Sequence, residues 1–403
     1  MRNAFHYGWV IVGVGLFIKM AALGFGRFAY PMLVPSMRES LGLHYGDMGL
    51  LSGGILLGYL LFSFIGGALA TRFGSKRVVI ASLLCSSLSM FAVSRFSAFS
   101  LLLIFTFGLG AGAAGAHIAM TTLPMAWFRK ESLGRALGVL MGGTGVGVII
   151  TGLLLPPLLS SFGREGWREC WMLMAWVTFL VCVAGVLLLK ERPEKIDLDS
   201  FPSPEGIATP IKEEDLSLRM IFLIYFLFGI AYNIYTTYFV AFMVEELYIA
   251  EKIAGLIWSL FGWTCIGSGV IWGFISDRLG RRQALLWNNG TISLAVFLPL
   301  CFHQPLLLGV STFLFGATFL GTVTIIAASV GDQVMNKRAS IYGLVTLVHG
   351  IGQLLGTTSG GYLRDFTGSF NLTLLVSLTG FLLCLILVAF ARKQGGTMGK
   401  SDE

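Results

Sequence analysis

Charged side chains are scarce in this chain. Asp, Glu, Lys and Arg together make up 12% of its 403 residues, and hydrophobic residues make up 55%. A soluble globular domain carries roughly 25% charged residues. The composition therefore excludes an ordinary soluble protein and predicts a polytopic membrane protein surrounded by the lipid bilayer.

Cysteine patterns and catalytic groupings are also missing. The six cysteines are scattered and show neither metal-ligand spacing nor a disulfide pattern; they are Cys85, Cys170, Cys182, Cys265, Cys301 and Cys384. We interpret them as small packing residues. No nucleophile and base are grouped together, and no nucleotide-binding loop is present. We therefore expect no enzyme activity, no metal and no cofactor.

Positive charge is unevenly distributed along the chain. The net charge is +7, with 28 Lys and Arg against 21 Asp and Glu. Most of these cations fall in segments on one side of the apolar runs, and the positive-inside rule places such segments in the cytoplasm. The charge thus indicates orientation in the membrane, and we expect no nucleic-acid partner. Both termini are predicted to be cytoplasmic, in a bacterial inner (plasma) membrane.

Long apolar runs recur through the chain. A helix needs about 18 or more apolar residues to cross the hydrocarbon core. Twelve such spans are predicted, at about 8–37, 48–71, 78–94, 98–126, 136–159, 168–189, 219–244, 253–276, 283–302, 305–331, 341–363 and 371–391. The first run is far longer than the core of a signal peptide, so it is expected to stay as the first span.

The two halves of the chain repeat each other at an offset of 205 or 206 residues. Gly24 matches Gly229, and Arg72 matches Arg278. The stretch between the halves is rich in proline and charge, which is typical of a linker. We predict an all-α membrane protein of two pseudo-symmetric six-helix bundles, at 1–190 and 218–403, joined by a cytoplasmic linker at 191–217. A substrate site is expected between the bundles, near the middle of the membrane.

Two short loops carry glycine among basic residues, one in each half. The first runs from Gly67 to Arg77 and the second from Gly273 to Arg282. Both resemble the loop between the second and third helices of the major facilitator superfamily, although Thr71 replaces the acid in the first copy. The resemblance implies conformational gating by Gly67, Arg72, Gly74, Arg77, Gly273, Asp277, Arg278, Gly280, Arg281 and Arg282.

The resemblance to the superfamily covers essentially the whole chain. Within the superfamily, the chain looks most similar to the monocarboxylate and oxalate:formate carriers. The run from Gly360 to Ser369 is similar to that branch. The branch places a carboxylate-binding arginine on its eighth helix, and the corresponding run here, Ala254 to Ser276, contains none.

Glycines are concentrated on the predicted fifth and eleventh helices. They give these helices flat faces that another backbone can approach closely. The residues are Gly138, Gly142, Gly143, Gly145 and Gly147 on the fifth, and Gly343, Gly350, Gly352, Gly356, Gly360 and Gly361 on the eleventh. The two interpretations are tight packing alone or a moving gate between the halves.

Arg27 is the sharpest functional signal, because a cation inside a span is costly unless it faces water, an acid or a bound anion. The resemblance implies that the first helix lines the central cavity, where the guanidinium would bind a carboxylate through two hydrogen bonds. The alternative is a structural ion pair, although no span carries an acid at its centre. Lys19, eight residues earlier, either adds a second positive charge to the site or snorkels to the cytoplasmic interface.

Polar residues on the seventh and eleventh helices complete the predicted site. The repeat offset aligns Tyr232 with Arg27 and Tyr235 with Tyr30. The full set of candidate substrate-binding residues is Arg27, Tyr30, Tyr232, Asn233, Tyr235, Lys19 and Gln353. The alternative is that some of these aromatic residues, and Tyr238 first, belong to the belt at the membrane interface.

Two histidines lie inside predicted spans and are candidates to carry a coupling proton, since imidazole titrates near neutral pH. They are His117 and His349, and Gln353 lies one turn beyond His349 on the same face. The alternative for each histidine is a structural hydrogen bond between helices.

Together these features predict a secondary active transporter, expected to be a monomer, that moves a small organic anion by alternating access. Uptake with a proton is expected, because an anion entering the cell works against a potential that costs about 2.3 kcal/mol per charge per 100 mV. Two alternatives stay open: an exporter of drugs or amphiphilic compounds, and a non-transporting receptor on a carrier scaffold.

Overall fold

The computed structural model describes residues 7–191, 216–333 and 338–391, and this part of the chain is almost entirely helical, without strands. The first half contains α1 (Gly8–Lys19), η1 (Met20–Phe28), α2 (Tyr30–Leu41), α3 (Tyr45–Phe73), α4 (Ser75–Arg95), α5 (Phe99–Thr122), η2 (Leu123–Ala126), α6 (Lys130–Phe162), η3 (Gly163–Glu165) and α7 (Gly166–Leu188). The second half contains α8 (Leu218–Ala241), η5 (Phe242–Glu246), α9 (Glu251–Leu279), α10 (Arg281–Cys301), α11 (Pro305–Gln333), α12 (Arg338–Thr367) and α13 (Asn371–Phe390).

Ten helical stretches in the described residues are long and apolar enough to cross a membrane. One of them, Ser132–Leu188, contains both α6 and α7, and α12 is not among the ten. These stretches confirm the all-helical membrane architecture, while the number twelve stays a prediction. The predicted linker falls largely on residues 192–215, which lie outside the described part of the chain.

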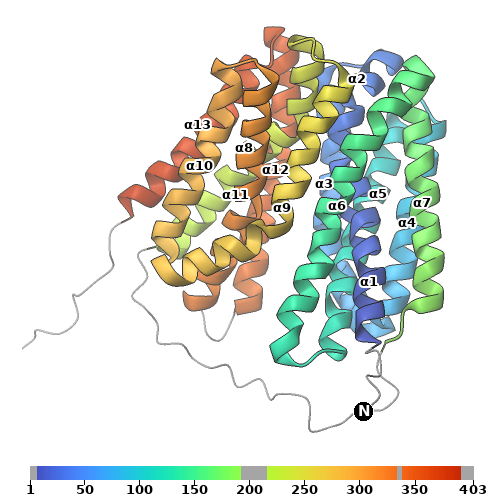
Figure 1. Ribbon diagram of the computed structural model, residues 1–403, viewed down its shortest axis with the longest axis vertical. Coiled ribbons are helices and arrows are strands. Elements are labelled where there is room, and N and C mark those ends of the chain that lie inside the picture. The colour runs from blue at the N-terminus through green and yellow to red at the C-terminus, as the bar shows by residue number, and fades with distance from the viewer. Residues whose placement is uncertain (1–6, 192–215, 334–337, 392–403) are drawn as a thin grey trace, which may run out of the picture.

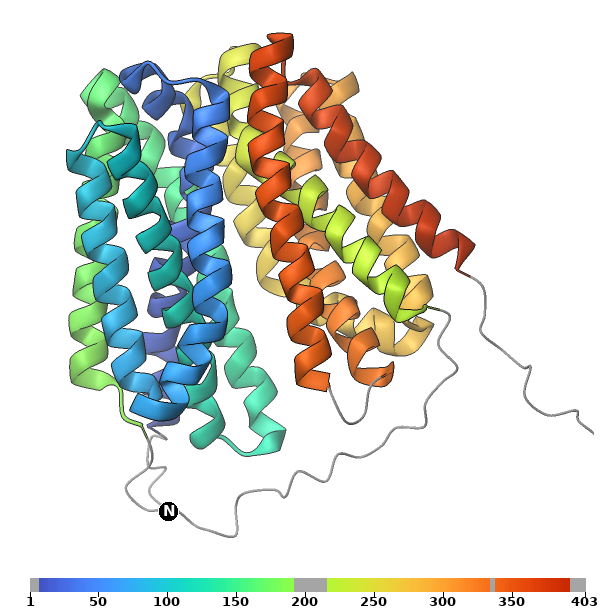
Figure 2. The same cartoon turned by 180° about the vertical axis from the view of Figure 1, so that it is seen from behind.

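The helices form two bundles, one from each half of the chain (Figures 1 and 2). The bundles contact each other where α6 packs against α9, α3 against α12 and α2 against α8. Their ribbons approach at the end where α2 finishes, hereafter the α2 end, and diverge toward the end where α1 begins (Figure 1). Because this second end carries the basic turns at Gly74 and Gly280, we call it the basic end.

Glycines allow the close approach of α6 and α9. A Cβ atom added at Gly145 would lie 2.6 Å from the carbonyl oxygen of Gly262, and one added at Gly152 would lie 2.6 Å from that of Gly255. Real Cβ atoms do not approach neighbours so closely, so larger residues would push the helices apart. The predicted close approach along the fifth helix is therefore confirmed.

The first span differs from the prediction of one continuous helix. It consists of α1, a π-helical turn η1 and α2, with a break at Ala29. Pro31 has no backbone N–H, so the carbonyl of Arg27 loses its usual donor four residues later. Widened π-helical turns occur frequently at functional sites. The break places Arg27 in the last turn of η1.

Both predicted basic loops form tight turns at glycines with positive φ, +90° at Gly74 and +88° at Gly280. This backbone conformation is open to glycine without steric cost. In the second loop, Arg281 pairs with Asp277 at 2.6 Å and with Asp332 at 2.8 Å.

The first loop lacks the acid at Thr71, but a carboxylate comes from elsewhere in the chain. Glu191, just after α7, accepts a hydrogen bond of 2.7 Å from the backbone N–H of Lys76. A Cβ atom at Gly74 would lie 2.5 Å from the same Glu191 oxygen, so the glycine also makes room for this carboxylate.

Candidate functional site

Arg27 lies at the interface of the two bundles and is partly buried. Its Nη2 donates hydrogen bonds to the hydroxyl of Tyr232 on α8 and, at 2.7 Å, to Oε1 of Gln353 on α12. The guanidinium carbon also lies 5.2 Å from the ring centre of Tyr59 on α3. All three partners are neutral, so none of them balances the positive charge of the guanidinium. The tertiary structure thus brings the predicted residues Tyr232 and Gln353 to Arg27, together with Tyr59, which was not predicted.

The α8 and α12 side of this cluster is held together by its own contacts. Nδ2 of Asn233 donates to the backbone carbonyl of Gln353 at 3.3 Å. His349, one turn before Gln353, stacks on Tyr225 with ring centres 4.0 Å apart, and its Nδ1 lies 3.0 Å from the Tyr225 carbonyl oxygen. Gln353 therefore reaches Arg27, while His349 is enclosed in an aromatic stack behind it.

A small cavity of about 20 Å³ lies beside Arg27 between the bundles. Its wall includes Ser52 of α3 and Asn233 of α8 as well as the predicted residue Tyr30. A water molecule needs about 10–15 Å³ of such volume. This conformation therefore has room for roughly one water molecule next to the guanidinium, and a substrate needs the bundles to move.

Lys19 forms a second buried cluster inside the first bundle. Its side chain is 0% exposed. Its Nζ lies 2.9 Å from Nδ1 of His117 and donates to the His117 carbonyl at 2.8 Å and to Oγ1 of Thr121 at 2.6 Å. The alternative of a lysine snorkelling to the interface is therefore wrong. The ring of His117 lies 6.3 Å from the ring of Tyr59, so Tyr59 lies close to both this cluster and Arg27.

Two other candidates point into their own bundles. The hydroxyl of Tyr30 donates to the carbonyl of Met48 at 2.7 Å, and the hydroxyl of Tyr235 bonds Oγ of Ser311 at 2.7 Å. Tyr30 still lines the central cavity, whereas Tyr235 packs on the ring of Phe315 with centres 4.1 Å apart.

Tyr238 is fully buried, and its hydroxyl donates to the carbonyl of Thr357. The alternative that Tyr238 belongs to the aromatic belt is therefore wrong.

Sequence reasoning missed Tyr59 and Ser52, both on α3. A tyrosine and a serine inside an apolar span are a weak signal, because either side chain can be satisfied locally. The sequence does not show which face of α3 points toward Arg27, so it could not select these two residues.

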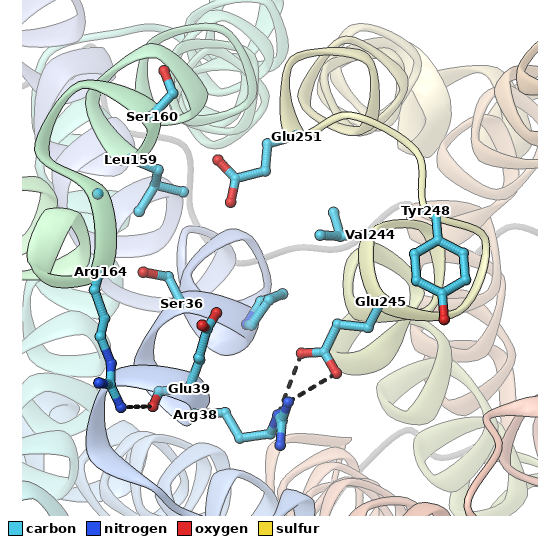
Figure 3. Close-up of a pocket in the computed structure, with 12 residues that line it drawn as sticks. Ser36, Arg38, Glu39, Leu159, Ser160, Arg164, Val244, Glu245, Tyr248 and Glu251 are labelled. Carbon is cyan, nitrogen blue, oxygen red and sulfur yellow. Dashed lines mark hydrogen bonds and ion pairs between the residues drawn. The ribbon is translucent and has the colours of Figure 1, made fainter.

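The bundles are tied together at the α2 end, beyond the central cavity. Arg38 of α2 pairs with Glu245 of η5 at 3.2 Å. The carboxylate of Asp365 on α12 accepts hydrogen bonds from the backbone N–H groups of Tyr45 at 2.9 Å and Gly46 at 2.7 Å, at the start of α3. A larger cavity of about 530 Å³ opens around the Arg38 pair, with Glu251 and Arg164 on other walls (Figure 3). An ion pair and two hydrogen bonds thus join the bundles on this side of the central cavity.

Residues 19–389 match the family model described as "Uncharacterised MFS-type transporter YbfB". The chain belongs to the major facilitator superfamily. This membership agrees with the two bundles, the repeated basic turns and the polar cluster between the halves.

Relatives in the superfamily span most of the chain. The Hexuronate transporter of Bacillus subtilis is 26% identical over 375 residues, covering 86% of this chain and 85% of the relative. The Probable sulfoacetate transporter SauU of Cupriavidus necator is 22% identical, covering 87% and 86%. Monocarboxylate transporter 11 of Homo sapiens is 27% identical, covering 92% and 80%.

Solved structures share the fold. A bacterial homologue of the human lysosomal transporter Spinster, in an inward-facing and occupied conformation, superposes with a TM-score of 0.76 at 15% identity, covering 96% of this chain and 97% of the other. The nucleoside transporter NupG superposes with a TM-score of 0.76 at 13% identity, covering 94% and 98%. The family match and the sequence relatives show that the protein is a transporter-type member of the superfamily.

Proposed function

We propose that this protein is a secondary active transporter that takes up a small organic carboxylate with a proton by alternating access. The observation that carries the proposal is Arg27, a guanidinium at the interface of the bundles whose hydrogen-bond partners Tyr232 and Gln353 are neutral. A cation in such a place is costly without an anion. A carboxylate matches the fork of the guanidinium and would supply the missing charge.

Binding of the carboxylate changes the contacts of Arg27. In this structure Nη2 of Arg27 is used by Tyr232 and Gln353, which belong to the opposite bundle. An arriving carboxylate competes with both side chains for the guanidinium. Substrate binding would therefore exchange contacts between the bundles, which links binding to their relative movement. Asn233 and Tyr30 stand in the wall of the same cavity, whereas Tyr235 and Lys19 support it from inside the bundles.

Orientation follows from the basic residues. The turns at Gly74 and Gly280 carry clusters of Arg and Lys, so the positive-inside rule favours a cytoplasmic basic end and cytoplasmic termini. The ion pair of Arg38 and the hydrogen bonds of Asp365 then close the outer face. The conformation described here corresponds to a state that is closed toward the outside of the cell membrane.

His117 is the stronger of the two candidates for the coupling proton. Its Nδ1 lies 2.9 Å from the Lys19 ammonium, so protonating the ring would place two positive charges side by side. A bound anion near Arg27 would offset this repulsion. Anion and proton would then favour each other's binding. His349, by contrast, is held by the Tyr225 carbonyl within the aromatic stack.

The relatives support an anionic substrate. The names of three of them refer to hexuronate, sulfoacetate and monocarboxylate, all of which are anions. Arg27 is the one charged residue among the described residues that line the central cavity, and one carboxylate neutralises it, so a monoanion fits best.

Thermal unfolding of the purified protein in detergent tests the proposal. A ligand that binds only the folded state stabilises it by about 2.7 kcal/mol at a hundred times its Kd. Small carboxylates are expected to raise the Tm of the wild type and to lose this effect in Arg27→Gln. Arg27→Lys should retain part of it, since lysine keeps the charge but lacks the fork. Arg95→Gln, at an exposed arginine of α4, is the matched control and should respond like the wild type.

Uptake into proteoliposomes then distinguishes the alternatives. Carboxylate accumulation driven by an imposed proton gradient is expected, and it should stop when a protonophore collapses that gradient. Stabilisation by cationic amphiphiles alone would favour the exporter. Binding of carboxylates without any transport would favour the receptor.

A further inference from the structure

Two buried polar groups next to Arg27 have unused hydrogen-bonding capacity. Ser52 is 7% exposed, and its hydroxyl has no hydrogen-bond partner among the described residues. Other hydroxyls of α3 bond to carbonyls of their own helix, as Ser63 does to Leu60 at 2.7 Å and Thr71 to Gly67 at 3.0 Å. Ser52 lines the cavity, and its hydroxyl is not one of the fully buried atoms that lack a partner, so it is open to a group that enters the cavity.

Asn233 presents the second unused group. It is 4% exposed, and its Nδ2 donates to the Gln353 carbonyl. Since a carbonyl can only accept, this bond fixes the orientation of the amide. No described residue donates to its Oδ1, and the residue lines the same cavity as Ser52 and Arg27.

The two groups come from different bundles and are brought together by a glycine. A Cβ at Gly49 would lie 2.6 Å from both the Tyr238 hydroxyl of α8 and the Thr357 carbonyl of α12. The close approach of α3 to these helices occurs one turn before Ser52. The cavity is therefore lined by Ser52 from one bundle, by Asn233 from the other and by Arg27.

We infer that Ser52 and Asn233 recognise a hydroxyl group that neighbours the carboxylate of the substrate. This inference rests on the proposed function of Arg27 and specifies its substrate class as small hydroxy acids. The substrate hydroxyl donates to Oδ1 of Asn233 and accepts from the hydroxyl of Ser52. A hydroxyl satisfies both groups at once, whereas the alkyl group of a plain acid leaves both unpaired.

Pairs of acids that differ by one hydroxyl test the inference: glycolate against acetate, and lactate against propionate. Affinities are measured from the concentration dependence of the Tm of the full-length protein in detergent. Wild type is expected to bind the hydroxy acid about tenfold more tightly than its partner, and Ser52→Ala is expected to reduce this preference to about two- to threefold. Its affinity for acetate and propionate should stay within about twofold of wild type.

The matched control is Ser87→Ala, at another buried serine whose hydroxyl already donates to the Ala175 carbonyl at 2.9 Å. This variant should keep the wild-type preference even if its Tm falls. Equal binding of both acids by wild type, or equal weakening of both by Ser52→Ala, overturns the inference while Arg27-dependent binding leaves the proposed function in place. Binding that survives in Arg27→Gln, or that is absent from wild type, refutes the proposed function and this inference with it.

Discussion

Replacing Asp365 by asparagine should open the α2 end of the protein. The Asp365 carboxylate accepts from two backbone N–H groups at the start of α3, across the interface of the bundles. A hydrogen bond to a charged group contributes about 1.5–3 kcal/mol, and a negative charge near a helix N-terminus adds about 0.3–1 kcal/mol. Asp365 is exposed, which weakens both effects, and asparagine keeps one acceptor oxygen. We therefore expect a net loss of about 1 kcal/mol, or roughly a fivefold shift toward the open state.

Alkylation of a cysteine between the bundles measures this shift. Ile55 lines the central cavity and is 2% exposed, so Ile55→Cys is a suitable reporter for a membrane-impermeant maleimide. The rate of labelling should rise about fivefold when Asp365→Asn is added. The matched control is Asp47→Asn, because the Asp47 carboxylate accepts at 3.0 Å from the His44 N–H at the same helix start but within one bundle. Unchanged labelling in Asp365→Asn, or the same increase in both variants, would refute the role of Asp365 as a tie between the bundles.

Three further changes have expected outcomes. Gly145→Ala should overpack against α9 and lower the Tm of the detergent-solubilised protein by an amount equivalent to about 1–3 kcal/mol. Gly138→Ala is the control, because its added Cβ has no neighbour within 4 Å, and it should not lower the Tm. Lys19→Met should leave the protein folded, as judged by its elution on gel filtration. It should weaken carboxylate binding in the thermal assay, because it removes a positive charge near the site. Unaltered binding would contradict a contribution of Lys19 to the site. Glu191→Gln should cost about 0.5–1.5 kcal/mol of stability by weakening the bond to the Lys76 N–H, and an unchanged midpoint of thermal unfolding would show that this contact is unimportant.

Much of the architecture could be predicted because it depends on local chemistry. Scarce charge and long apolar runs require membrane helices, since only such segments satisfy their backbone inside a bilayer. The repeat offset predicted two similar bundles, and the glycines of the fifth helix predicted its close approach to another helix. Arg27 could be selected as a candidate functional residue from its position alone, because a charge inside a membrane span is costly and so needs water or a partner.

The partners of these residues came only with the tertiary structure. Tyr232 and Gln353 were predicted to share a site with Arg27, but they lie 205 and 326 residues from it along the chain, so their direct hydrogen bonds to the guanidinium could not be predicted. The same holds for the bonds of Lys19 to His117 and for the carboxylate of Glu191 at the first basic loop.

The contacts between helices could not be predicted because of the medium that surrounds the helices. In water, the polar face of a helix shows which side is exposed, so the sequence indicates where each residue points. In a bilayer, lipid and protein core are both apolar, so the hydrophobic pattern does not separate the faces of a helix. The sequence by itself thus determined that this protein is a membrane protein, and it predicted two related halves and a candidate substrate-binding cation in the first span. Only the packing of the helices decided which side chains meet that cation, because packing alone sets the rotation of each helix about its axis.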